Sequence, residues 1–301
     1  MQKIFITGAN GQLGRDLVHE LTQRGVSCIA SDIQENFSGS ESCEYMKLDI
    51  TNYNDVEKVL KISRPDRLIH CAAWTAVDLA EDDSNKSKVF AINVKGTENI
   101  ARVCAELNII MTYISTDYVF NGEGVKAWQP EDESFNPVNY YGLTKLEGEF
   151  AVKKFLRDFF IVRIAWVFGQ NGNNFVKTML KLSENHDTLR VVNDQIGTPT
   201  YTPDLARLLA DMNETNKFGI YHATNDEQEN FISWYDFACE IFNQSGKNIN
   251  VIPVTTLEYG LSKAKRPYNS RLDKQKLKDS GFELLPDWRD ALRRYLLINA
   301  N

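Results

Sequence analysis

The chain has 301 residues, 43% of them hydrophobic and 25% charged, a composition typical of a globular protein that can bury a sizeable core. Its 34 Lys and Arg stand against 41 Asp and Glu, and the resulting net charge of −7 argues against non-specific binding of nucleic acid. No apolar run approaches the roughly 18 residues of a membrane span, and a strand pattern begins almost at Met1, so we expect neither a membrane span nor a signal peptide.

The cysteines and histidines indicate where the protein works. The five cysteines are scattered and include no Cys-x-x-Cys pair, which is typical of reduced thiols in a cytoplasmic protein and not of a disulfide framework or a zinc site. The four histidines show no spacing suited to a metal, and His70 and His222 fit the core or a turn better than catalysis. We therefore predict no metal site from the residues themselves.

The first predicted element is a short strand over 4–6, followed by a glycine-rich turn and a helical pattern over 12–24. The turn reads Thr-Gly-Ala-Asn-Gly-Gln-Leu-Gly, with the spacing Gly-x-x-Gly-x-x-Gly. Glycines let the backbone approach phosphates, and a helix N-terminus favours their negative charge. A turn that binds nothing is the alternative, but its flanking strand and helix favour binding of a dinucleotide pyrophosphate by Gly8, Asn10, Gly11, Gln12, Leu13 and Gly14.

A second strand over 26–30 leads to Asp32, 18 residues beyond Gly14. An acid at this place can accept hydrogen bonds from the adenosine ribose, which favours NADH, although it could also cap a turn. Arg15 could instead attract the 2′-phosphate of NADPH, so both cofactors stay open.

Strands over 46–50 and 68–73 alternate with helices over 54–63 and about 84–107, which predicts a doubly wound parallel sheet of the Rossmann type. Asp49 and Ile50 could flank an adenine, and the small Ala72 and Ala73 would let a cofactor lie across the sheet edge. The carboxyl ends of all the strands meet at that edge.

A strand over 109–114 ends in Ser115 and Thr116, and Tyr141 begins a helix that carries Lys145 one turn later on the same face. An ammonium beside a phenol stabilises the phenolate and lowers the pKa of the tyrosine from about 10 toward neutrality, which suits a proton donor. A surface tyrosine and a solvated lysine are the bland alternative. The adjacent cofactor edge favours the catalytic interpretation.

A strand over 160–167 follows, and Trp166 near its end is either a core aromatic or a site residue. The polar loop over 170–174 marks a boundary. We expect a dinucleotide-binding domain over 1–168 and a smaller mixed α/β substrate domain mainly over 169–301, from which the chain returns in part to the first domain. Asn174 begins a helix as a cap or as a ligand, and basic residues near Arg266 either bind a diphosphate or form a solvated loop.

The chain resembles the extended short-chain dehydrogenase/reductases over nearly its whole length and, within them, the dTDP-4-dehydrorhamnose reductases. The resemblance is most specific in Ser-Thr-Asp-Tyr-Val-Phe at 115–120 and in Asp-Gln-Ile-Gly-Thr-Pro-Thr at 194–200. The other matching segments are 7–14, 71–78, 92–93, 141–149, 163–168, 172–175 and 266–267.

The resemblance implies NAD(P)H-dependent reduction of dTDP-4-dehydro-L-rhamnose to dTDP-L-rhamnose, for cell-surface polysaccharide, by a homodimer. Tyr141 would protonate the C4 carbonyl oxygen while the nicotinamide delivers hydride to C4. Lys145 would hold the nicotinamide ribose and lower the Tyr141 pKa, and Thr75 would lie near the nicotinamide. The implied substrate residues are Thr116, which would bind the reacting oxygen, with Asp117, Tyr118, Trp166, Asn174 and Arg266.

The sequence also departs from the family. Trp74 stands where a tyrosine is more usual, and Asn121 where an acid is common. Some members bind Mg²⁺ at a dimer interface through glutamates, and Arg15 occupies a position where one of those acids is expected. A sugar-nucleotide epimerase or dehydratase and a non-catalytic regulatory relative stay open as alternatives, although Tyr118 stands where a dehydratase usually has a second acid.

Overall fold

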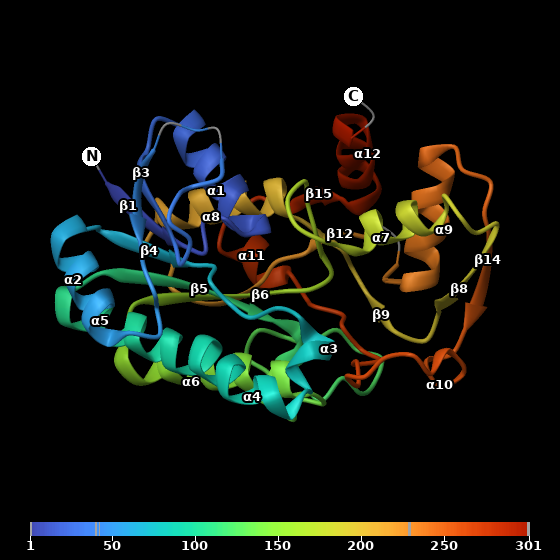
Figure 1. Ribbon diagram of the computed structural model, residues 1–301, viewed down its shortest axis with the longest axis horizontal. Helices are drawn as coiled ribbons and strands as arrows, with labels where there is room; N and C mark the ends of the chain where they lie inside the picture. Colours follow the sequence, from blue (N-terminus) through green and yellow to red (C-terminus); the bar gives the residue numbers. More distant parts are fainter. Residues whose placement is uncertain (1, 40, 42, 228–229, 300–301) are drawn as a thin grey trace.

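The computed structural model describes residues 2–39, 41, 43–227 and 230–299, and its centre is a parallel sheet of seven strands (Figure 1). The strand order is β11-β6-β5-β4-β1-β2-β3, so the chain starts in the middle and winds outward in both directions. The prediction of a doubly wound parallel sheet is confirmed. The strands are β1 (Lys3–Thr7), β2 (Ser27–Asp32), β3 (Glu44–Lys47), β4 (Arg67–His70), β5 (Ile110–Thr116), β6 (Phe159–Ile164) and β11 (Gly219–His222).

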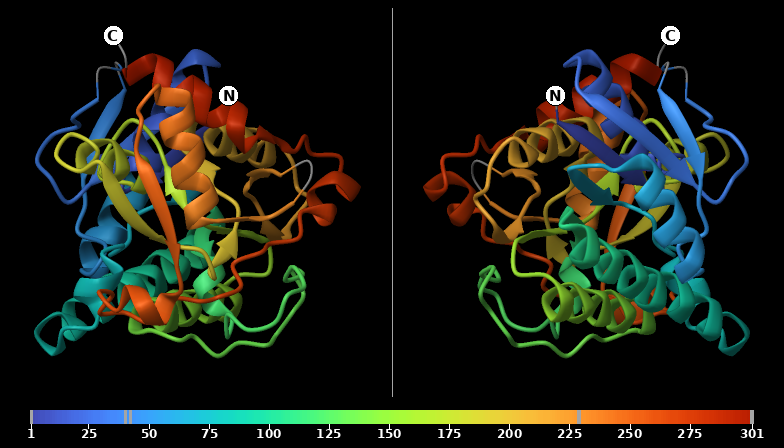
Figure 2. Two further views of the ribbon diagram at one scale, coloured as in Figure 1. Left: turned by 90° about the vertical axis from the view of Figure 1, so that its right-hand side faces the viewer. Right: turned by 90° about the vertical axis from the view of Figure 1, so that its left-hand side faces the viewer.

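Helices cover both faces of this sheet. On one face α1 (Gln12–Gln23) packs along α8 (Thr202–Asn213); on the other lie α2 (Tyr53–Ser63), α5 (Thr97–Leu107) and α6 (Tyr140–Phe155) (Figures 1 and 2). The apolar residues of α1 recur at helical spacing, and Leu13, Leu17, Val18 and Leu21 are all buried. Burial on both faces explains why the strands read as continuous apolar runs.

The helical pattern over 84–107 is helical throughout but not regular. It consists of α4 (Asp83–Phe90), one π-helical segment η1 (Ala91–Gly96) and α5, preceded by the short α3 (Val77–Ala80). The π segment turns Asn93 inward, where its amide bonds the backbone of Trp74 and the hydroxyl of Thr144. Such wide turns often occur at functional sites, and sequence periodicity does not predict them.

Three predicted strands end earlier than expected, at Lys47, His70 and Ile164. After His70 the chain packs directly against the glycine turn. The two segments lie so close that a Cβ on Gly8 would be 2.6 Å from the Ala72 nitrogen. After Ile164 the backbone kinks at Trp166, which has a φ of +51°, a rare value for a bulky residue. The chain then forms β7 (Val167–Phe168), which pairs with β10 (Thr200–Tyr201).

A second, smaller unit lies beyond β7. Its core joins Phe168, Val176, Phe237, Trp288 and Tyr295. Its main elements are the helices α7 (Phe175–Leu182), α9 (Trp234–Ser245) and α12 (Trp288–Asn299) and the parallel pair β8 (Thr188–Val192) and β14 (Asn250–Val254). Its short elements are β9 (Ile196–Gly197), β12 (Asn225–Asp226), β13 (Ile232–Ser233), β15 (Leu285–Asp287) and α10 (Thr256–Tyr259). The short helix α11 (Gln275–Asp279) lies nearer the large sheet.

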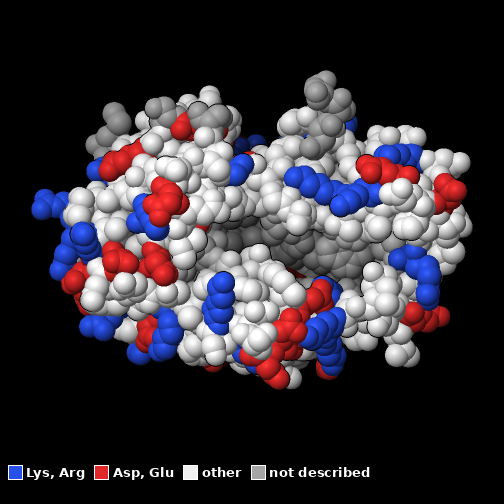
Figure 3. Space-filling model, viewed as in Figure 1, with Lys and Arg blue, Asp and Glu red and all other residues white. Residues whose placement is uncertain are grey.

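The chain returns to the large sheet between these elements, since α8 packs on α1 and β11 pairs with β6. The space-filling view is hollowed where the sheet half meets the second unit (Figure 3). Within the described residues, no helix is long and apolar enough to cross a membrane.

Candidate active site

A cavity of about 380 Å³ lies at the carboxyl ends of β1, β2 and β4. Seven of the predicted cofactor residues line it, namely Gly8, Gly11, Asp32, Asp49, Ile50, Ala72 and Ala73. It is also lined by residues that the sequence did not predict to bind the cofactor, namely Thr7, Ser31, Ile33, Leu48, Thr51, Cys71, Lys88, Ala91 and Ile92. Thr7, Cys71 and Ile92 lie in segments that carry the family resemblance, whereas nothing in the sequence pattern marks Lys88 or Ala91, which approach from α4 and the π segment.

The glycine turn is shaped to admit phosphates. Gly8 has a φ of +68°, and a Cβ on Gly14 would lie only 2.2 Å from the Gly8 carbonyl oxygen. Neither position tolerates a side chain. The first turn of α1 has no acidic residue, and its N-cap Gly11 provides no side chain to occupy the free backbone N–H groups. The chemistry of this helix N-terminus therefore fits a dinucleotide pyrophosphate.

Asp32 is half-buried beside the glycine turn, where Oδ2 accepts from the Asn10 backbone at 3.0 Å and Oδ1 from the Ile33 backbone at 2.8 Å. Each oxygen keeps a further lone pair for a ribose hydroxyl. The Asn10 side chain holds the loop after β2, since its Oδ1 accepts from the Ser38 backbone and hydroxyl.

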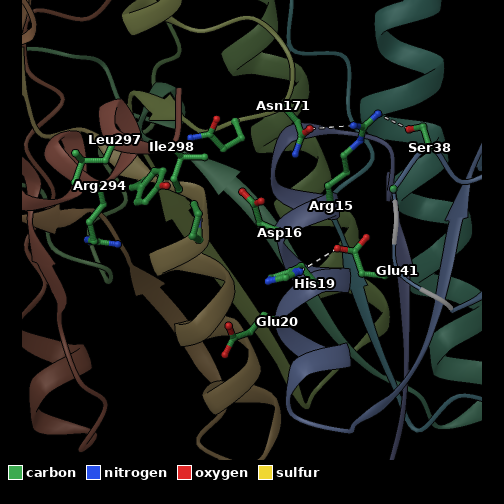
Figure 4. A pocket seen from close by; sticks show the side chains of 14 residues that line it. Arg15, Asp16, His19, Glu20, Ser38, Glu41, Asn171, Arg294, Leu297 and Ile298 are labelled. Carbon is green, nitrogen blue, oxygen red and sulfur yellow. Dashed lines mark hydrogen bonds and ion pairs between the residues drawn. The ribbon is translucent and has the colours of Figure 1, made fainter. Parts of the chain in front are cut away.

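The remaining predicted cofactor residues do not line the cavity. Leu13 is buried in the core and Thr75 is exposed, whereas Gln12 accepts a hydrogen bond from Asn174 at 3.1 Å. Arg15 lines a different cavity of about 790 Å³, where its guanidinium donates to Asn171 at 2.9 Å and to Ser38 (Figure 4). Across the described part of the chain, no group of three or more His, Cys, Asp or Glu could hold a metal ion.

Thr116, Tyr141 and Lys145 come together where β5 ends against the first turns of α6. Asn139 caps this helix by accepting from the Gly142 backbone at 2.8 Å, which fixes the start of α6 at Tyr140, one residue before Tyr141. The Thr116 hydroxyl lies close enough to the Tyr141 phenol to lower the pKa of that phenol. The Lys145 ammonium donates to the Ile114 carbonyl at 2.7 Å and lies 4.0 Å from the centre of the Tyr113 ring.

The pKa values in this cluster differ from the prediction. Burial and the nearby Asp117 carboxylate raise the pKa of Tyr141, and the Thr116 hydroxyl only partly opposes them. The expected lowering of the Tyr141 pKa by Lys145 is wrong, because burial outweighs it; the lysine is buried too, and its own pKa is lowered to about 7. A phenol with a raised pKa is protonated at neutral pH, but it is a weaker acid than the lowered pKa of the prediction would make it.

Asp117 is 1% exposed, and its Oδ1 accepts from the Thr116 hydroxyl at 2.9 Å. Its Oδ2 is buried without a well-formed hydrogen bond among the described residues, although the Ser270 hydroxyl beside it favours the carboxylate. Burial nevertheless raises the pKa of Asp117 to about 7. This carboxyl is therefore poised to change charge in the neutral range, which the sequence did not indicate.

The other predicted substrate residues occupy varied surroundings. Tyr118 packs edge-to-face on Tyr141 with ring centres 5.8 Å apart, and Trp166 stacks on Trp234 at 3.8 Å. Arg266 forms two hydrogen bonds to Asp78, at 2.6 and 3.2 Å, which tie the segment between α10 and α11 to α3. Asn174 accepts from the Lys177 backbone as the N-cap of α7, so its capping alternative is realised, whereas its role toward a substrate stays a prediction.

Known proteins resemble this chain along its whole length. The family model described as RmlD substrate binding domain matches residues 1–300. The spore coat polysaccharide biosynthesis protein SpsK of Bacillus subtilis is 38% identical over 98% of this chain and 97% of its own. The dTDP-4-dehydrorhamnose reductase of Aggregatibacter actinomycetemcomitans is 39% identical over 97% of this chain and 98% of its own.

A solved structure agrees with these sequence matches. The dTDP-4-dehydrorhamnose reductase of Bacillus anthracis, in complex with NADP, superimposes with a TM-score of 0.89 and 37% identity over 99% of this chain and all of the other. The family match spans both the sheet half and the second unit. The chain belongs to the dTDP-4-dehydrorhamnose reductase family, within the extended short-chain dehydrogenase/reductases.

Proposed function

We propose that the protein reduces the C4 ketone of dTDP-4-dehydro-L-rhamnose to dTDP-L-rhamnose with NADPH or NADH. The observation that carries this proposal is the full-length kinship with reductases of this name, at 37% and 39% identity. Because the matches span nearly the whole chain, and because the glycine turn and the Thr116, Tyr141 and Lys145 cluster are also present in this sequence, the proposal does not rest on fold alone.

The cofactor supplies the hydride, and the chain supplies position and one proton. Gly8, Gly11 and the N-terminus of α1 would hold the pyrophosphate, and Asp32 would bind the adenosine ribose. Asp49, Ile50, Ala72 and Ala73 would surround the adenine and the middle of the cofactor. The ammonium of Lys145 would bind the nicotinamide ribose, for which its burial beside Cys71 suits it.

Tyr141 gives its phenolic proton to the C4 carbonyl oxygen as hydride reaches C4, and the electron pair of the carbonyl bond becomes the new O–H bond. Thr116 hydrogen-bonds the same oxygen and keeps it within reach of the phenol. Asp117, Tyr118 and Trp166 surround the sugar. Arg266 would bind the diphosphate. Its guanidinium would then donate hydrogen bonds both to the phosphates and to Asp78.

Three further properties belong to this proposal. The protein works in the cytoplasm, acts as a homodimer and contributes to a cell-surface polysaccharide. The spore coat polysaccharide protein of Bacillus subtilis, which is 38% identical, supports the last of these. We also propose the division into a cofactor domain over 1–168 and a substrate domain mainly over 169–301. The second core around Phe237 and Trp288 supports this division, and that core also takes in Phe120 and Phe168 from the first range.

The test is oxidation of NADPH and of NADH by the purified protein in the presence of dTDP-4-dehydro-L-rhamnose. We expect turnover by the wild type and a loss of about a hundredfold or more in kcat for Tyr141→Phe. Tyr140→Phe is the matched control, since it removes a neighbouring hydroxyl that only contacts the Lys86 carbonyl at 3.3 Å. A folded protein that binds cofactor but turns over neither mixture contradicts the proposal.

A further inference from the structure

Behind the candidate active site lies an ion pair with no solvent exposure. Arg163 of β6 donates from Nε and Nη2 to the two carboxylate oxygens of Glu149 on α6, both at 2.8 Å. Both side chains are 0% exposed. The bidentate geometry fixes the carboxylate in one orientation.

Every remaining polar group of this pair has a partner. Glu149 Oε1 also accepts from the Ser115 hydroxyl at 2.5 Å. Arg163 Nη1 donates to the Pro130 carbonyl at 3.2 Å and lies 3.4 Å from His222 Nε2, while His222 Nδ1 lies 3.1 Å from the Trp128 carbonyl. Burial and the neighbouring guanidinium hold the pKa of His222 well below its usual range, so a neutral ring donates to Trp128 and accepts from Arg163.

The pair is joined to the catalytic cluster through three consecutive residues of β5. The Ile114 carbonyl accepts from the Lys145 ammonium, the Ser115 hydroxyl binds Glu149, and the Thr116 hydroxyl lies beside Tyr141. Glu149 also follows Lys145 by one helical turn of α6, so the two side chains share a face of that helix. Strand and helix thus place one carboxylate behind the lysine from two directions.

Stability alone does not account for such a pair. Taking two charges out of water costs about as much as their attraction returns, and well-packed apolar side chains of similar volume are often as stable. We therefore looked for a second role of the pair. The Glu149 carboxylate can act on the Lys145 ammonium, whose charged form it favours.

We propose that Glu149 is a positioning residue of the reduction, whose carboxylate, oriented by Arg163 and Ser115, keeps Lys145 charged and in place for the cofactor. The inference rests on the proposed function, because it assigns a partner to the lysine of that mechanism. It predicts a specific defect when the charge of Glu149 is removed and its shape is kept.

The groups that face Lys145 support this assignment. Burial lowers the lysine pKa to about 7, and Glu149 raises it again, followed by Cys71. Burial raises the pKa of the Cys71 thiol to about 12, so it carries no charge at neutral pH. Burial and Lys145 lower the pKa of His70 to about 3, so that ring is neutral too, and Tyr113 presents its ring face to the ammonium while its hydroxyl donates to the Lys145 backbone carbonyl. Glu149 is the anion that acts on the lysine from the described residues around it.

The sign of the effect follows from these groups. An ammonium is lost as the pH rises through its pKa, and without Glu149 that pKa is lower. In Glu149→Gln, the decline of kcat at alkaline pH should therefore move to lower pH by about one unit or more. At low pH, where Lys145 is protonated in both proteins, kcat should approach that of the wild type.

Three variants separate the charge from the packing. Glu149→Asp keeps the charge and should keep the alkaline decline where it is. Glu149→Gln combined with Arg163→Met removes both charges, so it should fold without an unpaired guanidinium and still show the shifted decline. Glu147→Gln, on the same helix and partly exposed, is the matched control and should leave the profile unchanged.

The measurement is the pH profile of kcat at saturating cofactor and substrate for all four proteins beside the wild type. A profile that stays in place in the double variant, or that moves equally in Glu149→Asp, overturns the inference. The ¹³Cε resonance of Lys145, assigned through Lys145→Arg, titrates without substrate. This titration distinguishes a failure of the proposed function from a failure of the role of Glu149. If the wild type shows no turnover, the proposed function is contradicted. If the Lys145 titration is unchanged in Glu149→Gln or in the double variant, the role of Glu149 is contradicted.

Discussion

The buried carboxyl of Asp117 makes the protein less stable than it could be, and Asp117→Asn should reveal this. Its folded pKa is about 7, whereas an unfolded aspartate has a pKa of about 3.9. Because the folded pKa is the higher one, the contribution of this group to stability is full below about pH 3.9 and is lost as the pH rises through 7. The difference of about three units corresponds to about 4 kcal/mol.

The asparagine cannot ionise, and its amide oxygen can still accept from the Thr116 hydroxyl. Between pH 5 and pH 8 the wild type should lose about 2.7 kcal/mol from this group, and the variant should not. For a chain of this length the Tm advantage of Asp117→Asn should grow by on the order of 5 °C over that range. We expect this gain in stability to be accompanied by reduced turnover. Asp117 lies in the candidate substrate site, and residues that destabilise the fold at such sites often serve activity.

Thermal unfolding of both proteins without ligand, at pH 5 and pH 8, tests this reasoning. Asp158→Asn, which changes an exposed aspartate, is the control and should show no pH-dependent difference from the wild type. If the Tm difference between Asp117→Asn and the wild type is the same at both pH values, the burial argument is refuted.

Three other changes have defined outcomes. Gly14→Ala, whose Cβ would lie 2.2 Å from the Gly8 carbonyl, should abolish binding of NADPH and NADH measured by fluorescence. Gly25→Ala is the control: its φ of +67° should make the substitution cost some stability, but the open space around it should leave affinity unchanged. Retained binding by Gly14→Ala would contradict the close packing of the turn. Asp32→Ala should weaken NADH binding by about tenfold or more through the loss of charged hydrogen bonds, and should weaken NADPH binding less, which titration of both cofactors can check. Asn174→Ser should keep the cap of α7 whereas Asn174→Ala should lower stability by about 1 kcal/mol; a raised substrate KM in the serine variant would support a substrate contact by the amide.

Much of the fold could be predicted because its signals are local. The apolar run of β1, the glycine turn and the spacing of Leu13, Leu17 and Leu21 identify the first strand, turn and helix without knowledge of the rest. The π segment could not be predicted, since it depends on Asn93 meeting Trp74 and Thr144, which are distant in sequence. The early end of β4 likewise depends on the approach of Gly8.

The candidate site divides in the same way. The motif residues Thr116, Tyr141 and Lys145 could be found by type and spacing, but the direction of their pKa shifts could not, because burial dominates those shifts. Glu149 is visible in the sequence four positions after Lys145, but its burial in an ion pair depends on Arg163 of β6, which the helix spacing does not reveal. Spacing along a helix predicts neighbours on that helix and nothing across the sheet.

The late position of β11 in the chain has a consequence for synthesis on the ribosome. The sheet reaches its last strand only at Gly219–His222, after the whole segment from β7 to α8 has been made. Until that strand emerges, β6 presents an unpaired edge on which other nascent or unfolded chains could add a strand. Most strands of the sheet are therefore synthesised early, but the sheet is completed only when β11 pairs with β6. Any pause in synthesis between β6 and β11 lengthens the time for which the edge of β6 is exposed.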